Sequence, residues 1–462
     1  MERLITYKSA KEIDRLSQDK YLIPSISLME SAARSFYLEI KDKLKSSKLT
    51  VFVAGSGNNG ADALAVARMA FCDGIKNIKI YFVLGHQSKE NKIQYDICKA
   101  LDIPFTTEIS GDLIIDGLIG VGFSGSLSLE KKKIVDEINK GEYIISLDCP
   151  SGIKEDGESY SVKANETITF GYEKVAFYTS NNISYLGKVS VVNPSFPLDK
   201  LSLNDPYFKI NFDDLSIKPI DERMYKNKKG HVAIVGGSKE YSGAIRLSER
   251  AAFKAGAGLV TVFTSPSAYE IVAKENLSPI VRRFDDLKTS NNYDALLIGP
   301  GLTDLSGKEV LDFINLFNNK ICIVDAGAIK LLGENRDMLV DGSNIVITPH
   351  LGEFKSLLGI MNIESSNTLC DLISVSKELK GATIVLKSSI TIIYQNEAFY
   401  FLNQPNPALG VAGSGDVLAG IITALKDPIQ GVLLHSLAGY NAHKSLGFFT
   451  SEELIDEVGR IR

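Results

Sequence analysis

A glycine-flanked carboxylate in the C-terminal half is the group best placed to do chemistry. The segment Gly413-Ser414-Gly415-Asp416 stands directly before a helical pattern with an apolar stripe. The glycines allow the backbone to fold tightly over an anion, which the first-turn N–H groups and the helix dipole then face. At this position Asp416 can accept the proton of a substrate hydroxyl as its oxygen attacks phosphorus. The alternative is an aspartate that only caps the helix.

The N-terminal half carries another glycine-rich turn. Gly55, Gly57 and Gly60 form a G-x-G-x-x-G pattern after an apolar run and before an apolar helical stretch. This context is typical of a turn that offers backbone N–H groups to a nucleotide phosphate. A standard dehydrogenase also needs an acid about 20 residues further on to hold the ribose, and the segment 83–86 has none. A tight turn without a ligand is the alternative.

Polar residues cluster at three predicted strand ends in this half. Asn59 and Asp62 belong to the glycine-rich turn, Asp116 closes the run LIID, and Asp148 closes YIISLD shortly before Ser151. The carboxyl ends of parallel strands meet at one edge of a sheet, so these side chains are expected at one rim. Oxygen donors of this kind suit an alkali or alkaline-earth cation better than zinc or copper. Each aspartate alone could instead cap a helix or form a turn.

Short apolar runs that end at these turns predict the strands that position the candidate residues. They alternate with helical patterns in both halves, at 49–54, 78–84, 113–116, 143–148 and 166–170, then at 231–235, 258–263, 295–298, 321–325, 345–348 and 382–386. Strands that are apolar on both faces belong to parallel sheets covered by helices. We therefore predict an α/β protein with two doubly wound domains.

A polar stretch with four prolines separates the two halves. It covers 193–225 and contains Pro194, Pro197, Pro206 and Pro219. Linkers between domains have this composition. The length of 462 residues fits two to three domains of roughly 100–200 residues. The predicted domains are residues 1–213 and 214–462.

Composition excludes several classes of protein. The chain has 51 Lys and Arg against 56 Asp and Glu, a net charge of −5, which argues against a nucleic-acid binder that neutralises phosphates. The five cysteines are scattered and form no C-x-x-C pair, as expected of reduced thiols. A polar N-terminus and the lack of an apolar run near ~20 residues argue against secretion and membrane insertion. We expect a cytoplasmic protein without a structural metal.

The motifs together resemble two known enzyme domains. Through residues 412–416 the C-terminal half resembles the ribokinase-like superfamily. More narrowly, it is similar to the ADP/ATP-dependent NAD(P)H-hydrate dehydratase domain, on segments 236–238, 241–244, 254–260, 299–301 and 348–350. The N-terminal half resembles the Rossmann-like NAD(P)H-hydrate epimerase domain, on segments 58–62, 116–120 and 148–152. Their order is that of the fused bacterial bifunctional repair enzymes.

The resemblance implies that the N-terminal domain interconverts the R and S forms of hydrated NADH and NADPH. Asn59, Asp116 and Ser151 would hold a potassium ion, and Asp148 is the candidate for proton transfer. The residues implied in substrate binding are Asn58, Asn59, Gly60, Ala61, Asp62, Gly120, Val121, Gly122, Phe123, Ser124, Gly125, Ser126 and Asp148. Ala61 departs from the family pattern, which has glycine there.

The resemblance implies that the C-terminal domain dehydrates the S form at the expense of ADP or ATP with Mg²⁺. Asp416 would be the catalytic base. The hydrate would contact Ala257, Gly301, His350 and Asp416, and the adenine nucleotide would contact Lys387, Ser388, Ser389, Ile390, Thr391 and Gly415. Leu351 and Ser388 depart from the proline and glycine of the family. The resemblance also implies a homo-oligomer that binds neither nucleic acid nor membrane.

Two other functions remain compatible with the residues. The C-terminal domain could be a ribokinase-like kinase for a small molecule, with the N-terminal domain as a nucleotide-binding regulator. The N-terminal half could also be a non-enzymatic module that senses a ligand or binds a partner.

Overall fold

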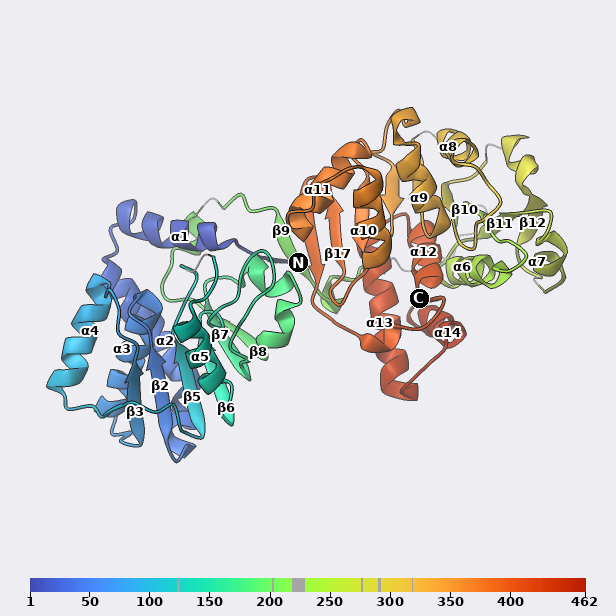
Figure 1. The fold of residues 1–462 in the computed structure, drawn as a ribbon. Coiled ribbons are helices and arrows are strands. Elements are labelled where there is room, and N and C mark those ends of the chain that lie inside the picture. The colour runs from blue at the N-terminus through green and yellow to red at the C-terminus, as the bar shows by residue number, and fades with distance from the viewer. Residues whose placement is uncertain (123–124, 202, 218–228, 276, 290–291, 318) are drawn as a thin grey trace. The chain divides into compact units, whose positions relative to one another are not determined.

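The computed structural model describes residues 1–122, 125–201, 203–217, 229–275, 277–289, 292–317 and 319–462. The chain divides into an N-terminal unit, Arg3–Tyr207, and a C-terminal unit, Phe208–Arg462 together with Met1–Glu2 (Figure 1). This division falls six residues before the predicted boundary after residue 213. The reason is strand β9 (Tyr207–Ile210), which is the neighbour of β18 (Ala398–Leu402) in the sheet of the C-terminal unit.

The sheet of the N-terminal unit has seven described strands in the order β4-β3-β2-β5-β6-β7-β8. All neighbouring pairs are parallel. Strand order reverses between β2 and β5, and ligands of doubly wound sheets bind outside the carboxyl ends of strands at such a point. The strands are β2 (Thr50–Ala54), β3 (Ile78–Phe82), β4 (Phe105–Thr106), β5 (Leu113–Gly117), β6 (Tyr143–Leu147), β7 (Glu166–Phe170) and β8 (Lys188–Val192).

Helices cover both faces of this sheet. Apolar side chains of α2, α3 and α4 pack with Phe52 of β2 and Ile80 of β3, whereas α5 packs on the opposite face against Val51 and Val53. The predicted doubly wound α/β architecture is therefore confirmed for this unit. The helices are α1 (Tyr7–Asp19), α2 (Ser25–Ser46), α3 (Asn58–Cys72), α4 (Lys89–Ala100) and α5 (Leu129–Ile138).

The C-terminal unit is built on a larger sheet, with the order β1-β9-β18-β17-β16-β15-β14-β13-β10-β11-β12. The strands from β10 to β16 pair in parallel, and β16, β17 and β18 pair antiparallel. The strands are β1 (Glu2–Arg3), β10 (His231–Val235), β11 (Leu259–Thr264), β12 (Ile280–Arg283), β13 (Ala295–Ile298), β14 (Ile321–Val324), β15 (Ile345–Ile347), β16 (Thr383–Leu386), β17 (Ile392–Gln395), and the β9 and β18 given above.

Helix α12 is the central helix of this unit. It packs against α6, α13 and α14 through a cluster that includes Ala251, Val417, Ile421 and Leu454. The helices are α6 (Ser242–Lys254), α7 (Tyr269–Glu275), α8 (Gly307–Asn315), α9 (Gly327–Glu334), α10 (Leu351–Ile360), α11 (Thr368–Glu378), α12 (Ser414–Leu425), α13 (Pro428–Leu446) and α14 (Ser451–Ile461). In the described part of the chain, no helix has the length and apolar character that crossing a bilayer requires.

The start of α3 lies so close to the end of β2 that a side chain cannot fit between them. A Cβ atom added to Gly60 would lie 1.8 Å from the carbonyl oxygen of Gly55, whereas one added to Gly57 would meet nothing within 4 Å. Glycine at position 60 therefore lets the helix N-terminus reach the rim of the sheet.

We predict that Gly60→Ala displaces α3, because backbone atoms cannot yield as a flexible side chain can. The expected loss is about 1–3 kcal/mol in the free energy of unfolding, measured by urea denaturation. Gly57→Ala is the matched control and should stay within about 1 kcal/mol of wild type, the usual cost of alanine at a helix N-cap. Equal effects of the two changes would contradict this account of the turn.

Candidate active sites

The N-terminal unit has a cavity of about 1110 Å³ at the carboxyl ends of its central strands. It brings together Asn58, Asn59, Asp62, Gly120, Val121, Gly122, Ser126 and Asp148 of the predicted substrate-binding residues. Gly60 and Ala61 do not line this cavity. Gly60 lies directly against the backbone of Gly55, and Ala61 is fully buried. Gly125 lines a neighbouring cavity. Phe123 and Ser124 lie outside the described residues.

Asp148 is held by a lysine that the sequence analysis missed. Lys174, only 1% exposed, donates to Oδ1 of Asp148 at 2.7 Å. It also donates to Thr169 and to two backbone carbonyl oxygens, those of Phe170 and Tyr172. Oδ1 of Asp148 receives two further hydrogen bonds, from Thr169 Oγ1 and the Phe170 N–H, each at 3.1 Å.

The other carboxylate oxygen of Asp148 faces a different environment. No hydrogen bond to Oδ2 connects it with the described residues, and Asp148 lines the cavity. The backbone of Asp148 is left-handed, with φ 65°, a conformation that costs about 1–3 kcal/mol in a non-glycine residue. The residue is thus clamped through one oxygen, while the other is available to a ligand. The signal for Lys174 in the sequence was weak, because it lies in a loop four residues after β7 rather than in a motif.

Two more carboxyl groups line the same cavity. Burial raises the pKa of Asp62 well above its usual value, and repulsion from Asp148, Asp14 and Glu30 adds to the effect. Asp14 is exposed, yet nearby protein atoms that limit its hydration, and then the charge of Asp148, raise its pKa to about 6, while Lys174 opposes the shift. Asp14 lies on α1, outside any motif, so no sequence pattern pointed to it. Carboxyl groups of this kind can hold a proton near neutral pH.

Asp116 and Ser151 are brought together as predicted, but each is already bonded within the protein. Asp116 is fully buried. Its Oδ1 accepts from Ser151 Oγ at 2.5 Å and from the Leu118 N–H at 3.2 Å. Its Oδ2 accepts from Ser146 Oγ at 2.8 Å and from the Ser151 N–H at 2.9 Å. Burial raises the pKa of Asp116, and these hydrogen bonds oppose the shift.

Asn59 supplies an unsatisfied polar atom next to this pair. Its side chain is buried, and Nδ2 has no hydrogen-bond partner among the described residues. The amide lies against Gly120, in the loop that Asp116 and Ser151 fix through Leu118 and Ile119. An amide can turn to present its oxygen in place of its nitrogen. Amide, hydroxyl and carboxylate oxygens are the donors that a hard cation prefers.

The site of the C-terminal unit lies at the carboxyl ends of its parallel strands, where α12 begins. Gly413 precedes the helix with φ 88° and serves as its N-cap, and Asp416 lies in the first turn. Burial raises the pKa of Asp416 to about 7, with Asp325 and Glu353 adding to the shift and Lys387 opposing it. Asp416 is therefore poised to exchange a proton near neutral pH.

Lys387 joins three strand ends at this site. Its Nζ donates to Oδ1 of Asp325 at 3.0 Å, and the Thr348 hydroxyl donates to the same oxygen at 2.6 Å. Asp325 is 2% exposed. A Cβ atom on Gly415 would lie 3.2 Å from Lys387 Nζ, so the lysine also reaches the start of α12. Asp325 was missed, although it closes the run ICIVD just as Asp148 closes YIISLD.

A histidine beneath α12 fixes the first turn of that helix. Nε2 of His435 lies 3.2 Å from Ser414 Oγ and 3.1 Å from the Ser414 carbonyl oxygen. His435 belongs to α13 and is buried. Burial lowers its pKa to about 4, so the imidazole is neutral at physiological pH.

Most other predicted residues of this half lie around the same rim. His350 caps α10, where its Nδ1 accepts the N–H groups of Gly352 and Glu353. Gly301 follows β13 with φ 62°. Residues 388–391 form the turn from β16 to β17, in which Ile390 is buried and could reach a nucleotide only through its backbone. Leu351 begins α10 and is exposed.

Ala257 is not brought to this rim. It directly precedes Gly258 and strand β11, so it lies at the amino ends of the parallel strands, and its side chain belongs to the hydrophobic core. The other predicted residues follow the carboxyl ends. Within one chain, Ala257 and Asp416 therefore lie at opposite ends of the parallel strands, and the contact of Ala257 with the hydrate stays a prediction.

Comparison with known proteins assigns each half to a family. Residues 25–176 match the family described as YjeF-related protein N-terminus, and residues 232–458 match NAD(P)H-hydrate dehydratase. A protein of Coxiella burnetii named bifunctional NAD(P)H-hydrate repair enzyme Nnr is 31% identical over 97% of this chain and 96% of its own length. The chain belongs to the bifunctional NAD(P)H-hydrate repair enzyme family.

Other members of the repair enzyme family also span both units. The Escherichia coli protein of the same name is 30% identical over 89% of this chain and 82% of its own length. Among solved structures, a ribokinase-like superfamily protein of Enterococcus faecalis is 26% identical, with a TM-score of 0.49, covering 56% of this chain and 96% of that protein. Recognition of the bifunctional family from the sequence motifs is confirmed.

Removal of the buried lysine tests the account of Asp148. We predict that Lys174→Met lowers the free energy of unfolding by about 3–5 kcal/mol, because a buried carboxylate would lose its cation. The measurement is urea denaturation at pH 7. Lys163→Met, at an exposed position, should change stability by no more than about 0.5 kcal/mol. Adding Asp148→Asn to Lys174→Met should recover part of the loss, and a double variant no better than Lys174→Met would contradict the pairing.

Proposed function

We propose that this chain repairs hydrated NADH and NADPH. The N-terminal unit would interconvert the R and S forms, and the C-terminal unit would dehydrate the S form at the expense of ADP or ATP. The relatives' name supports this assignment. The observation that carries the proposal is the position of Asp416. It lies in the first turn of α12, which Lys387 also reaches, and its pKa is about 7.

In the C-terminal unit, Asp416 would accept the proton of the substrate's C6 hydroxyl as that oxygen attacks the terminal phosphorus of the nucleotide. The bond from this phosphorus to the bridging oxygen breaks, so AMP leaves when ADP is the donor and ADP leaves when ATP is the donor. Lys387 and the first-turn N–H groups of α12 would bind the transferred phosphoryl group. The C6–O bond then breaks as the ring nitrogen donates its lone pair, and inorganic phosphate leaves. Loss of a C5 proton restores the dihydronicotinamide ring.

The residues at this site fit the Mg²⁺ that accompanies nucleotide phosphates. Such an ion takes one or two carboxylates together with phosphate oxygens, and Asp325 supplies a carboxylate at the rim. Bound there, it would neutralise charge on the phosphates. Asp325 would in addition keep Lys387 directed at the start of α12.

In the N-terminal unit, Asp148 would transfer a proton to and from the substrate as its R and S forms interconvert. Its Oδ1 is clamped by Lys174, which leaves Oδ2 to act on the substrate, and Asp62, whose pKa is raised well above its usual value, lines the same cavity. The N–H groups at the start of α3 would bind the diphosphate. Asn59, Asp116 and Ser151 would hold a potassium ion, and the unpartnered amide of Asn59 supports this choice. Potassium would supply a fixed positive charge for the substrate phosphates.

We also propose that the enzyme acts in the cytoplasm as a homo-oligomer. Support for the compartment comes from the free thiols of all five cysteines, none of which forms a disulfide among the described residues. The oligomer is proposed from the family resemblance alone.

The function is tested with a mixture of both epimers of NADPH hydrate, ADP and Mg²⁺. Absorbance of the dihydronicotinamide in the near ultraviolet reports recovery. Full recovery is the expected result. Recovery of only the S fraction would contradict the epimerase assignment, and no recovery together with phosphorylation of a sugar or vitamin would establish a kinase instead.

Two substitutions should separate the two activities. Asp416→Asn should lower kcat/KM of dehydration by about 10²–10⁴-fold, the usual contribution of a general base, and leave epimerisation unchanged. Asp148→Asn should do the reverse. Chromatographic separation of the epimers measures epimerisation without ADP, and the absorbance assay measures dehydration. If each change lowered both activities equally, the division into two sites would be wrong.

The pH dependence of dehydration should report the ionisation of Asp416. Because the base must be ionised, kcat/KM should fall as the pH drops through about 7. Glu353→Gln removes a negative charge that raises the pKa of Asp416, so this limb should move to lower pH. Glutamine can keep the hydrogen bond from the His350 N–H, which preserves the capping box. A limb unchanged by Glu353→Gln would contradict the assignment of Asp416 as the titrating base.

A further inference from the structure

A buried asparagine holds the glycine-rich turn that precedes α3. Asn91 lies in the first turn of α4 and is 0% exposed. Its Nδ2 donates to the carbonyl oxygen of Gly55 at 2.9 Å and to that of Gly57 at 3.0 Å. Both glycines line the cavity of about 1110 Å³, whereas Asn91 does not. Asn91 therefore contacts the turn from the side that a ligand does not reach.

The hydrogen-bond partners of Asn91 fix the orientation of its amide. Its Oδ1 accepts from Gln87 Nε2 at 2.9 Å. The two carbonyl oxygens of the turn need a donor, and an amide turned over would place its own oxygen against them. The nitrogen of Asn91 is thus the atom that faces the turn.

A third carbonyl group of the turn is bonded to the start of the same helix. The N–H of Ser88, the N-cap of α4, donates to the Ser56 carbonyl oxygen at 3.0 Å. The carbonyl groups of residues 55, 56 and 57 therefore all accept hydrogen bonds from the start of α4. In a planar trans peptide, the N–H of the next residue points opposite to the carbonyl group. The N–H groups of residues 56, 57 and 58 are consequently turned away from α4.

These three N–H groups are available to a ligand. In the described part of the chain they donate to no other group, and residues 56–58 line the larger cavity. Successive backbone N–H groups form a concavity that binds anions, and the positive end of the α3 dipole adds to the attraction. The turn thus offers a row of donors to the diphosphate that NADH and NADPH share.

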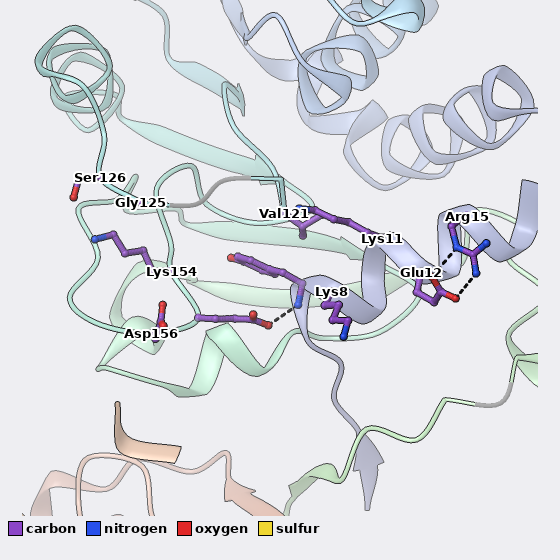
Figure 2. A pocket seen from close by; sticks show the side chains of 11 residues that line it. Lys8, Lys11, Glu12, Arg15, Val121, Gly125, Ser126, Lys154 and Asp156 are labelled. Carbon is purple, nitrogen blue, oxygen red and sulfur yellow. Dashed lines mark hydrogen bonds and ion pairs between the residues drawn. The ribbon is translucent and has the colours of Figure 1, made fainter. Parts of the chain in front are cut away.

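The neighbouring cavity is less suited to the diphosphate. It has a volume of about 640 Å³ and lies between α1 and residues 154–156 (Figure 2). Three acidic side chains line it beside its basic ones, and Figure 2 shows Lys11 and Lys154 on opposite sides of it. The row of N–H groups before α3 is the better position for the diphosphate, because no carboxylate belongs to that row.

We propose that Asn91 is a positioning residue for the diphosphate of the hydrated dinucleotide. It would hold the peptide groups of residues 55–57 so that the N–H groups of residues 56–58 stay directed at the phosphates. This inference rests on the proposed epimerase function, and Asn91 lies outside every sequence motif described above. The phosphates do not change during the reaction at the nicotinamide ring, so losing Asn91 should weaken substrate binding and leave the chemical step unchanged.

The test measures R/S interconversion of hydrated NADPH by the full chain without ADP or ATP. Asn91→Asp and Asn91→Leu both keep the approximate shape of the side chain and remove its donor. Each should raise KM about tenfold and leave kcat within about twofold of wild type, the pattern of lost binding that is equal in ground and transition state. The leucine variant adds no charge, so it separates loss of the donor from repulsion of the phosphates.

Asn182→Leu is the matched control. Asn182 is also 0% exposed, and its Nδ2 donates to two carbonyl oxygens, those of Lys154 at 2.9 Å and Ala176 at 2.7 Å. It does not line the larger cavity. Its loss should lower the urea midpoint of the chain about as much as loss of Asn91, and KM should not change.

Gln87→Ala is a milder variant at a half-buried position. It removes only the hydrogen bond that orients the Asn91 amide, so KM should rise about threefold, less than in the Asn91 variants. It decides the question if the Asn91 variants do not fold, and an unchanged KM would then overturn the inference.

The outcomes separate the inference from the proposed function. If the wild-type chain does not interconvert the R and S forms, the epimerase function itself fails. If it does, a rise of KM in both Asn91 variants but not in Asn182→Leu would establish the positioning role. An unchanged KM, a rise in Asn91→Asp alone, a fall in kcat alone, or an equal rise in Asn182→Leu would overturn it.

Discussion

A lysine–aspartate pair ties together two strand ends in each unit and holds polar groups of both sites. The pair is buried in the N-terminal unit, whereas in the C-terminal unit the aspartate is buried and the lysine only partly so. Lys174 reaches from the loop after β7 to Asp148 after β6, at 2.7 Å. Lys387, after β16, reaches Asp325 after β14, at 3.0 Å, with the Thr348 hydroxyl between them in the strand order. Burying such charges costs several kcal/mol per ion unless the geometry is good. The pairs are therefore best explained by the fixed position that they give to the polar groups at each rim.

The two sites use burial in different ways. In the C-terminal unit one carboxyl group, Asp416, has its pKa raised to about 7 next to helix N–H groups that favour anions. In the N-terminal unit, Asp14 and Asp62 keep their protons more readily than usual, first because their surroundings disfavour the ionised form and then because Asp148 repels a second negative charge. The first arrangement suits attack of a hydroxyl on phosphorus. The second suits exchange of a proton with a bound ring, without transfer of any other group.

Sequence reasoning located the architecture and most of each rim because apolar runs that end in polar turns mark the carboxyl ends of parallel strands. Asp116 and Ser151 are 35 positions apart in the sequence. They lie at one rim as this rule predicts, with Ser151 Oγ 2.5 Å from Asp116 Oδ1. The rule also covers Asp325, which could have been chosen on the same ground. It cannot find Lys174 or Asp14, since their positions depend on how a loop and α1 fold back over the sheet. Ala257 was placed by motif alone, and strand direction excludes it from the rim.

The histidine below α12, His435, is neutral at the pH at which Asp416 titrates. His435 holds Ser414 by contacts that do not need an ionised ring, since its pKa is about 4. Two residues further on, Asp416 gains and loses its proton near pH 7. His435, which supports the anion-binding turn, and Asp416, which exchanges the proton, therefore titrate about three pH units apart. The contacts of His435 with Ser414 thus do not depend on the protonation state of Asp416. Asp416 can exchange its proton without being needed to hold the turn in place.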